Sequence, residues 1–351
     1  MHILPGLLLA LGLALAGRYL SQLIGVDLMG LDKSPISAIM MAILLGILLR
    51  NTLSLPGAFQ PGISFGLVRV LRLGIVLLGI RLSLGEVGEI GLKSLPVIVA
   101  TVASALLIVT YLSRRLGLTH NLGTLLAVGT SVCGATAIVA TAPTIRARDD
   151  EVAYSVACIT LFGIIAMLVY PFFAEWLFAG DPFAAGLFLG TSVHETAQVA
   201  GAGLVYQEYF GDAEALDAAT VTKLVRNLGM LVIIPLMSIL HHRSHSDGGE
   251  APKWWTMIPL FIVGFAMMSL LRTVGDLGEQ PFGLLTQETW ERIVGHTKEA
   301  AEICLAVAMA AVGLGTSIRS LVTIGLKPLA MGLFAALLVG GVSAALVTLM
   351  Y

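Results

Sequence analysis

Gly129-Thr130-Ser131-Val132-Cys133-Gly134-Ala135-Thr136 interrupts one apolar run, and Gly190-Thr191-Ser192-Val193-His194-Glu195-Thr196-Ala197-Gln198 interrupts another. Both stretches open with the same four residues. In lipid, non-helical backbone is tolerated only where it lines a cavity or packs on protein. Glycine permits unusual φ angles, and a hydroxyl can cap a new helix start. The two stretches therefore predict two broken helices, each with free N–H groups and a positive dipole end inside the fold, which suits an anion.

The composition indicates a membrane protein. Of 351 residues, 57% are apolar and 12% are charged, with a mean hydropathy of +0.93; soluble domains carry about a quarter charged residues. The net charge of -2 gives no electrostatic footprint for nucleic acid. Cys133, Cys158 and Cys304 are far apart in apolar stretches, so we expect small core residues and no disulfide framework or metal site.

Apolar runs of spanning or near-spanning length recur along the chain, so we expect an all-α membrane protein with about 9–11 transmembrane segments in a single polytopic domain, residues 1–351. A polar stretch from Thr286 to Lys298 predicts a short amphipathic helix at the membrane interface. The expected segments lie near residues 5–24, 36–50, 63–84, 95–113, 123–145, 152–178, 183–204, 220–240, 256–272, 299–318 and 328–350.

Short internal matches indicate a duplication. Gly91-Leu92-Lys93-Ser94-Leu95 recurs as Gly325-Leu326-Lys327-Pro328-Leu329, and the same register aligns Gly79 with Gly313. Leu48-Leu49-Arg50 is repeated as Leu270-Leu271-Arg272. Numbered in the order given above, segments 2, 3 and 4 match segments 9, 10 and 11. The two polar stretches match segment 5 with segment 7, and segment 6 matches segment 8. Inverted repeats of this kind are a signature of secondary transporters.

Two topologies are compatible with the broken segments: re-entrant hairpins that enter and leave on one side, or broken helices that cross. With hairpins, every matched pair becomes inverted. Hairpins also keep Arg146 and Arg148 on the same side of the membrane as the N-terminus, and this side carries more basic residues than the other. The positive-inside rule then favours hairpins and a cytoplasmic N-terminus.

The polar residues of the two stretches are the candidate site. An ionisable pair within a membrane segment is costly and is a functional hypothesis by default, so we expect His194 and Glu195 to couple transport to H⁺ or Na⁺. Arg226 follows closely and is expected to contact substrate or Glu195, or to snorkel to the interface. The predicted substrate-binding residues are Thr130, Ser131, Cys133, Gly134, Thr191, Ser192, Gln198 and Arg226.

At these two stretches the sequence resembles the YeiH family of bacterial inner-membrane sulfate exporters. Leu77-Leu78-Gly79-Ile80-Arg81-Leu82-Ser83 and Thr222-Lys223-Leu224-Val225-Arg226 fit that family too. The resemblance implies a bacterial inner-membrane protein in the wide group of cation–proton antiporters and bile-acid symporters. Their fold pairs a core domain with a panel or scaffold domain and often forms dimers.

The leading interpretation is a secondary transporter of a small anion, sulfate or an organic sulfonate, with no enzyme activity, cofactor or metal. The partners we expect are the solute, the lipid bilayer and a second copy of the chain. The alternative is a cation–proton antiporter with Glu195 as its carboxylate. An ion channel would need pore-lining elements repeated around an axis. His194-Glu195-Thr196-Ala197-Gln198 lacks the second histidine of an H-E-x-x-H zinc signature.

Overall fold

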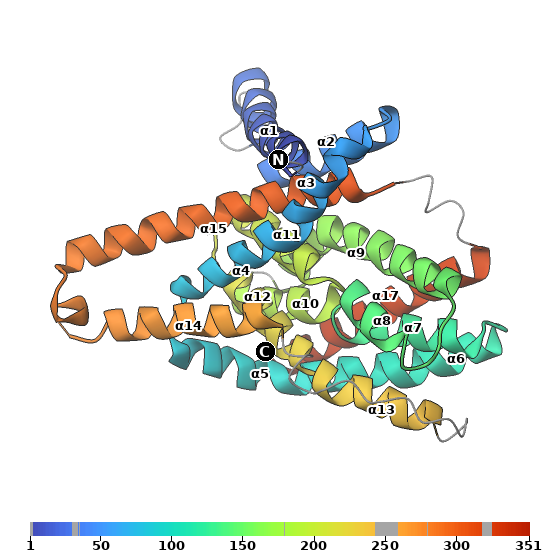
Figure 1. The fold of residues 1–351 in the computed structure, drawn as a ribbon. Helices are drawn as coiled ribbons and strands as arrows, with labels where there is room; N and C mark the ends of the chain where they lie inside the picture. Colours follow the sequence, from blue (N-terminus) through green and yellow to red (C-terminus); the bar gives the residue numbers. More distant parts are fainter. Residues whose placement is uncertain are drawn as a thin grey trace. The chain divides into compact units, whose positions relative to one another are not determined.

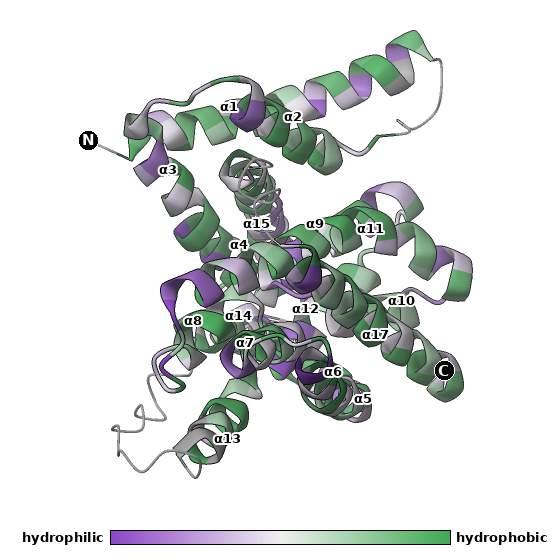
Figure 2. Ribbon diagram, turned by 90° about the vertical axis from the view of Figure 1, so that its right-hand side faces the viewer, coloured by the Kyte–Doolittle hydropathy of each residue, from purple (hydrophilic) through white to green (hydrophobic). Residues whose placement is uncertain are grey.

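The computed structural model describes residues 3–29, 34, 36–178, 180–242, 259–278, 280–317 and 325–351. Within these ranges every regular element is helical, which confirms the predicted fold class (Figure 1). Most of the helical ribbon is hydrophobic (Figure 2). In the described ranges, six helices are long and apolar enough to cross a membrane: Leu4–Gln22, Gly57–Arg81, Leu84–Arg115, Asp149–Phe178, Glu214–Met237 and Leu326–Met350.

The chain packs as two compact units. Unit 1 comprises Met1–Glu89, Leu204–Ala213 and Leu260–Arg319, and unit 2 comprises Ile90–Gly203, Glu214–Pro259 and Ser320–Tyr351. Unit 1 holds α1 (Leu4–Gln22), α2 (Ala38–Thr52), α3 (Gln60–Phe65), α4 (Leu71–Leu78), α14 (Leu260–Gly275) and α15 (Gln287–Gly315). Unit 2 holds α6 (Thr110–Arg115), α7 (His120–Ser131), α8 (Ala135–Thr141), α9 (Asp149–Phe178), α10 (Pro182–Ser192), α12 (Glu214–Leu228), α13 (Met230–His242) and α17 (Leu326–Met350). The chain passes from one unit to the other within α5 (Leu84–Ser104) and α11 (Thr196–Phe210).

Polar side chains cap the starts of several helices. Ser37 accepts a hydrogen bond from the amide of Met40 at the start of α2, and Asp181 accepts one from Ala184 at the start of α10. Thr119 caps α7 in the same way. Each cap satisfies one of the four amides that a helix start leaves without an intrahelical partner.

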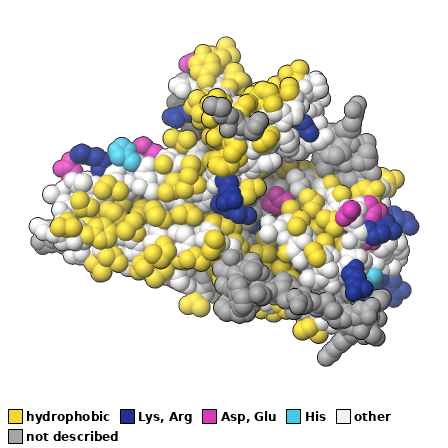
Figure 3. All heavy atoms as spheres, viewed as in Figure 1, with side chains coloured by type: hydrophobic (Ala, Val, Ile, Leu, Met, Phe, Trp, Pro, Cys, Tyr) yellow, Lys and Arg dark blue, Asp and Glu magenta, His cyan; other side chains and the backbone are white. Residues whose placement is uncertain are grey.

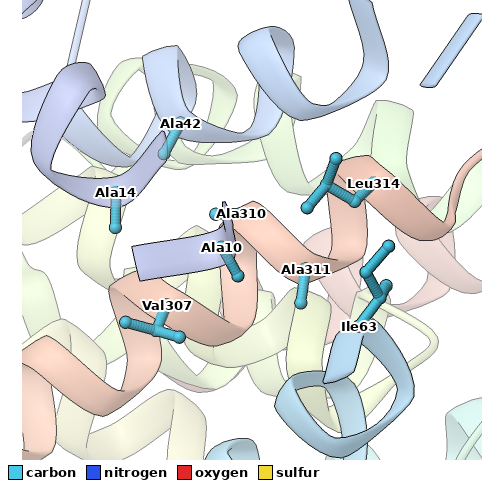
Figure 4. Packing of buried hydrophobic residues seen from close by; sticks show 8 residues of the cluster. All are labelled: Ala10, Ala14, Ala42, Ile63, Val307, Ala310, Ala311 and Leu314. Atoms are coloured by element: carbon cyan, nitrogen blue, oxygen red, sulfur yellow. The ribbon is translucent and has the colours of Figure 1, made fainter. Parts of the chain in front are cut away.

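Small side chains hold unit 1 together. Ala10 and Ala14 of α1, Ala42 of α2, and Ala310 and Ala311 of α15 form one buried cluster (Figure 4). Helices in lipid associate through such close contacts, because apolar burial gives them no advantage over lipid tails. Long apolar side chains accordingly remain on the outer faces, and on the face shown in Figure 3 they spread over α14 and α15.

Two glycine contacts in unit 1 repeat each other. A Cβ added to Gly313 of α15 would overlap the carbonyl oxygen of Ile43 in α2. A Cβ added to Gly79, next to α4, would overlap the carbonyl oxygen of Phe265 in α14. The sequence matches align Gly79 with Gly313, and the register of Leu48-Leu49-Arg50 with Leu270-Leu271-Arg272 aligns Ile43 with Phe265. The matched segments thus make the same helix–helix contact twice.

The first polar stretch reverses the chain within unit 2. The helix stops at Ser131, leaves helical geometry at Val132, and starts again after Gly134, whose φ of 71° is left-handed. An added Cβ at Gly129 of α7 would overlap the side chain of Ile138 in α8. Had the helix continued straight, these residues would be roughly 13 Å apart at 1.5 Å per residue. Therefore α8 folds back along α7.

The second polar stretch also reverses the chain. Gly186 of α10 and Gly203 of α11 lie against consecutive residues of α12, Ala215 and Leu216. A straight helix would separate these two glycines by roughly 25 Å. Both broken segments therefore form hairpins, which is one of the two topologies that the sequence left open.

The polar stretch before the tenth expected segment differs from its prediction. The predicted interfacial helix at Thr286 to Lys298 is not a separate element, because α15 runs from Gln287 to Gly315 without a break. No Gly or Pro separates the polar stretch from the apolar one at Lys298-Glu299-Ala300-Ala301. The polar stretch is thus the first half of a long helix.

Candidate functional site

The two helix breaks meet at Gly134 and Glu195, which occupy the same place in the two matched stretches. A Cβ on Gly134 would overlap Cγ of Glu195. The Glu195 carboxylate also lies near the Ala135 amide at the start of α8. One copy of the motif thus carries the carboxylate, and the other carries the only residue type that leaves room for it.

Lys223 of α12 joins the two breaks. Its side chain is fully buried, and its ammonium donates to the carbonyl oxygens of Val132 (2.9 Å), Val193 (2.9 Å) and His194. An ammonium has three N–H groups, and here each has an acceptor. The buried charge is therefore matched by the backbone of both breaks.

Arg226 lies one turn further along α12 and does the same for the ends of α7 and α10. Its fully buried guanidinium donates from Nε to the Ser131 carbonyl (2.7 Å) and from Nη2 to the Thr130 carbonyl. Nη1 donates to the carbonyls of Thr191 (2.7 Å) and Val193 (3.3 Å). The last carbonyls of a helix lack intrahelical partners and carry its negative dipole end, so a cation stabilises them. Within the described residues Arg226 contacts no carboxylate, and its predicted contact with substrate stays a prediction.

The four predicted hydroxyl residues, Thr130, Ser131, Thr191 and Ser192, are fully buried. Each hydroxyl donates to a backbone carbonyl four residues earlier in its own helix. Serine and threonine commonly bond in this way inside helices. Their side-chain protons are thus committed to α7 and α10, and substrate contact by these hydroxyls stays a prediction.

Glu195 belongs to a polar network with α9. The Thr160 hydroxyl donates to its Oε1 (3.1 Å), and its own amide donates to Gln198 Oε1 (3.2 Å). Gln198 Nε2 in turn donates to the Thr160 carbonyl (3.2 Å). Gly163 provides the space, because a Cβ there would overlap the Gln198 amide. Glu195 as a whole residue is half-buried, and the hydrogen bond from Thr160 holds its carboxylate in place.

His194 and Cys133, which also occupy matched places, are both buried. The His194 ring has no hydrogen-bond partner among the described residues, and its charged neighbours are Lys223 and Arg226. Cys133 Sγ lies 3.2 Å from Met230 Sδ in a hydrophobic cluster. The coupling role of His194 and the substrate contact of Cys133 stay predictions.

Four polar residues near the breaks were not singled out by the sequence. Thr136 is exposed, and Thr160 and Thr196 are half-buried. Asn227 is buried; its Nδ2 donates to the Thr196 hydroxyl (3.1 Å), and its Oδ1 has no partner in the described part of the chain. Thr136 and Thr196 lie in the first turns of α8 and α11. A hydroxyl residue just after each helix break is therefore the sequence signal that could have identified them. The accessible polar surface of the site is therefore at the helix starts.

Comparison with known proteins gives consistent matches over nearly the whole chain. A family model described as conserved hypothetical protein 698 matches residues 5–332. A UPF0324 membrane protein of Streptococcus pyogenes is 35% identical over 332 residues, which cover 94% of this chain and 92% of the relative. One of Pseudomonas aeruginosa is 34% identical over 359 residues, with 97% and 92% covered. One of Fusobacterium nucleatum is 33% identical over 303 residues, with 85% of each chain covered.

Proposed function

Because the chain belongs to the family of conserved hypothetical protein 698, whose curated relatives are UPF0324 membrane proteins, we propose that it is a secondary active transporter of a small anion. The observation that carries the proposal is the carboxylate of Glu195, a half-buried residue held where two broken helices meet. Discontinuous helices that meet in this way build the substrate and ion sites of many secondary transporters.

Charge at the site supports an anionic substrate. Two buried cations, Lys223 and Arg226, stand against the single carboxylate of Glu195. Their hydrogen bonds go to carbonyl groups, which have dipoles but no net charge. The centre of unit 2 therefore keeps an excess positive charge, and the starts of α8 and α11 add amides and the hydroxyls of Thr136 and Thr196. Sulfate or an organic sulfonate, the substrate class of the family that the sequence resembles, suits such a set of short donors.

Coupling is assigned to Glu195. A carboxylate at a half-buried position can exchange a proton with either side of the membrane while Thr160 and Gln198 hold its position. Loss of the proton would lower the net charge of the two cations and Glu195 from +2 to +1 and so weaken the attraction for the anion. Proton binding and anion binding at this centre are therefore expected to favour each other, which is the requirement for proton-coupled symport.

The alternative is a cation–proton antiporter, and the same carboxylate favours it. Glu195 Oε1, the Thr160 hydroxyl and backbone carbonyls are oxygen ligands that a sodium ion accepts. Against this alternative, six carbonyls of the two breaks are already bound by Lys223 and Arg226, namely those of Thr130, Ser131, Val132, Thr191, Val193 and His194.

The proposal includes an inverted repeat, a homodimer and an inner-membrane location with a cytoplasmic N-terminus. The equivalent contacts of Gly79 with Phe265 and of Gly313 with Ile43 support the repeat. Each unit holds both members of its matched segments, as expected if the two halves of a duplicated chain interleave. The bacterial relatives and the positive-inside rule support the location.

The test is uptake into proteoliposomes. We expect radiolabelled sulfate or taurine to accumulate under an inward pH gradient with the wild-type protein, and uptake to fall to background with Glu195→Gln. Glu299→Gln, which changes an exposed carboxylate of unit 1, is the matched control and is expected to behave like wild type. A sodium-dependent pH change that Glu195→Gln removes, without anion uptake, would replace the anion proposal by the antiporter.

A further inference from the structure

A cavity of unit 2 has none of the candidate site residues in its lining. Its volume is about 600 Å³, and it opens between η5 (Ala105–Val109), α6, α7 and α13. One part of its wall is apolar and includes Leu106, Leu107, Leu236 and Met237; the polar part includes Arg114 and His120. The cavity thus offers a long apolar surface next to a basic end.

Two arginines at the basic end have no carboxylate partner among the described residues. Arg114 Nη2 lies 3.3 Å from His120 Nδ1, and Arg115 Nε donates to the Tyr111 hydroxyl (3.1 Å) while its guanidinium stands over the Tyr111 ring. Neither arginine forms an ion pair with a described residue. Lys327 Nζ lies 4.0 Å from the place where a Cβ on Gly117 would stand.

The acidic residue that contacts Thr119, just before α7, has other partners than these arginines. Glu151 is buried, and its carboxylate accepts hydrogen bonds from the Thr119 hydroxyl and the Arg148 amide. The positive charge at the end of α6 therefore remains available to an external anion.

The position of this charge relates it to the bilayer. Arg114 and Arg115 end the apolar helix Leu84–Arg115, which is long enough to span a membrane. The end of such a helix lies at the depth of the lipid headgroups. Leu107, which is 71% exposed, and the cavity wall lie one to two turns deeper, at the depth of acyl chains.

We propose that this cavity is a binding site for an anionic phospholipid, with Arg114 and His120 on the phosphodiester and an acyl chain along Leu106, Leu107, Leu236 and Met237. Basic pockets between transmembrane helices recognise anionic headgroups through charge and hydrogen bonds. The apolar wall selects a lipid over a free anion, since a small hydrophilic ion gains nothing from it.

The test is native mass spectrometry of the full chain in detergent, titrated with phosphatidylglycerol or phosphatidylcholine. We expect tighter binding of phosphatidylglycerol, and a loss of about fivefold in its affinity with Arg114→Gln, because one basic residue near an anionic headgroup contributes about that factor. Ala103→Trp keeps the charge but fills the apolar wall, and it is expected to weaken both lipids.

The control is Arg69→Gln, which removes an exposed arginine of unit 1 in an equally apolar helix. Equal losses with Arg69→Gln and Arg114→Gln would show general surface attraction and overturn the proposal. Equal binding of the two lipids would also overturn it.

Inorganic phosphate is added as a competitor: displacement of phosphatidylglycerol by phosphate, with no effect of Ala103→Trp, would replace the lipid site by a free-anion site. Thermal unfolding of each variant distinguishes lost binding from lost folding.

Discussion

At the residue scale, the side chains that define the candidate site are those that form hydrogen bonds with the backbone at the two helix breaks. The sequence left Arg226 open between a contact with substrate or Glu195 and the membrane interface. In the structure Arg226 and its neighbour Lys223 are both fully buried and donate to carbonyl oxygens. The sequence could predict where the helices break, since glycine and hydroxyl residues interrupt apolar runs. It could not predict which way the hydroxyls or cations point, because the carbonyls that bind them become neighbours only after α7, α10 and α12 pack.

A methyl group at Gly134 meets two obstacles, a positive φ and the side chain of Glu195. Gly134→Ala adds a Cβ at a left-handed φ and against Glu195, and we expect it to lower the free energy of unfolding by about 2–3 kcal/mol and to abolish uptake. Gly180→Ala is the matched control, because Gly180 also has a positive φ but has nothing within 4 Å. Gly180→Ala is expected to lower the free energy of unfolding by about 1 kcal/mol, because of the positive φ alone. Thermal unfolding in detergent measures both; equal effects would contradict the contact with Glu195.

Arg226→Lys distinguishes a structural arginine from a substrate-binding one. Lysine cannot reproduce the planar fork that reaches both α7 and α10, so we expect a loss of about 2 kcal/mol in unfolding free energy. Arg292→Lys, at a 64% exposed side chain, is the control and is expected to change it by less than about 0.5 kcal/mol. An unchanged stability with a raised KM for uptake would instead support the substrate contact predicted from the sequence.

At the element scale, the two equivalent glycine contacts of unit 1 explain why short internal sequence matches indicated a structural repeat. The matched segments were recognisable because glycines at helix crossings cannot vary freely. Other boundaries were missed. Helix α5 begins at Leu84, well before the expected segment, where Ser83 and Glu86 exchange hydrogen bonds as a capping box. A search for apolar runs passes over such a start, because its first turns are polar.

The two equivalent crossings give a paired prediction. We expect Gly79→Ala and Gly313→Ala each to lower the free energy of unfolding by about 1–3 kcal/mol, because the new Cβ meets a backbone carbonyl that cannot move aside. Gly341→Ala in α17 is the control, with open space around it, and is expected to be neutral or slightly stabilising. Thermal unfolding provides the comparison. A tolerated alanine at only one of the two sites would contradict their equivalence.

At the scale of the whole molecule, the hairpin at the first break determines which loops share a side of the membrane. Thr124 near the start of α7 and Ile145 after α8 line the same cavity, so the chain enters and leaves this hairpin at one end. Single cysteines at Gly117 and Asp149 are therefore expected to react with a membrane-impermeant maleimide from the same side. The cysteine at Gly180, beyond the spanning helix α9, is expected to react from the other side.

This experiment needs a background without Cys133, Cys158 and Cys304, of which the first two are buried. Labelling of the cysteines at Gly117 and Asp149 from opposite sides would establish crossing broken helices and contradict the hairpin. The sequence alone could not decide this, because the two topologies differ in the placement of only Arg146 and Arg148 among the clearly basic loops.

The meeting of Gly134 with Glu195 has a consequence for how such a chain can arise. Two copies of one half-length polypeptide would place the same residue at both positions. Two glycines would leave no carboxylate, and two glutamates would compete for one space with like charges in contact. The centre therefore requires that its halves differ, and a chain carrying both halves allows one to keep the acid while the other gives it room.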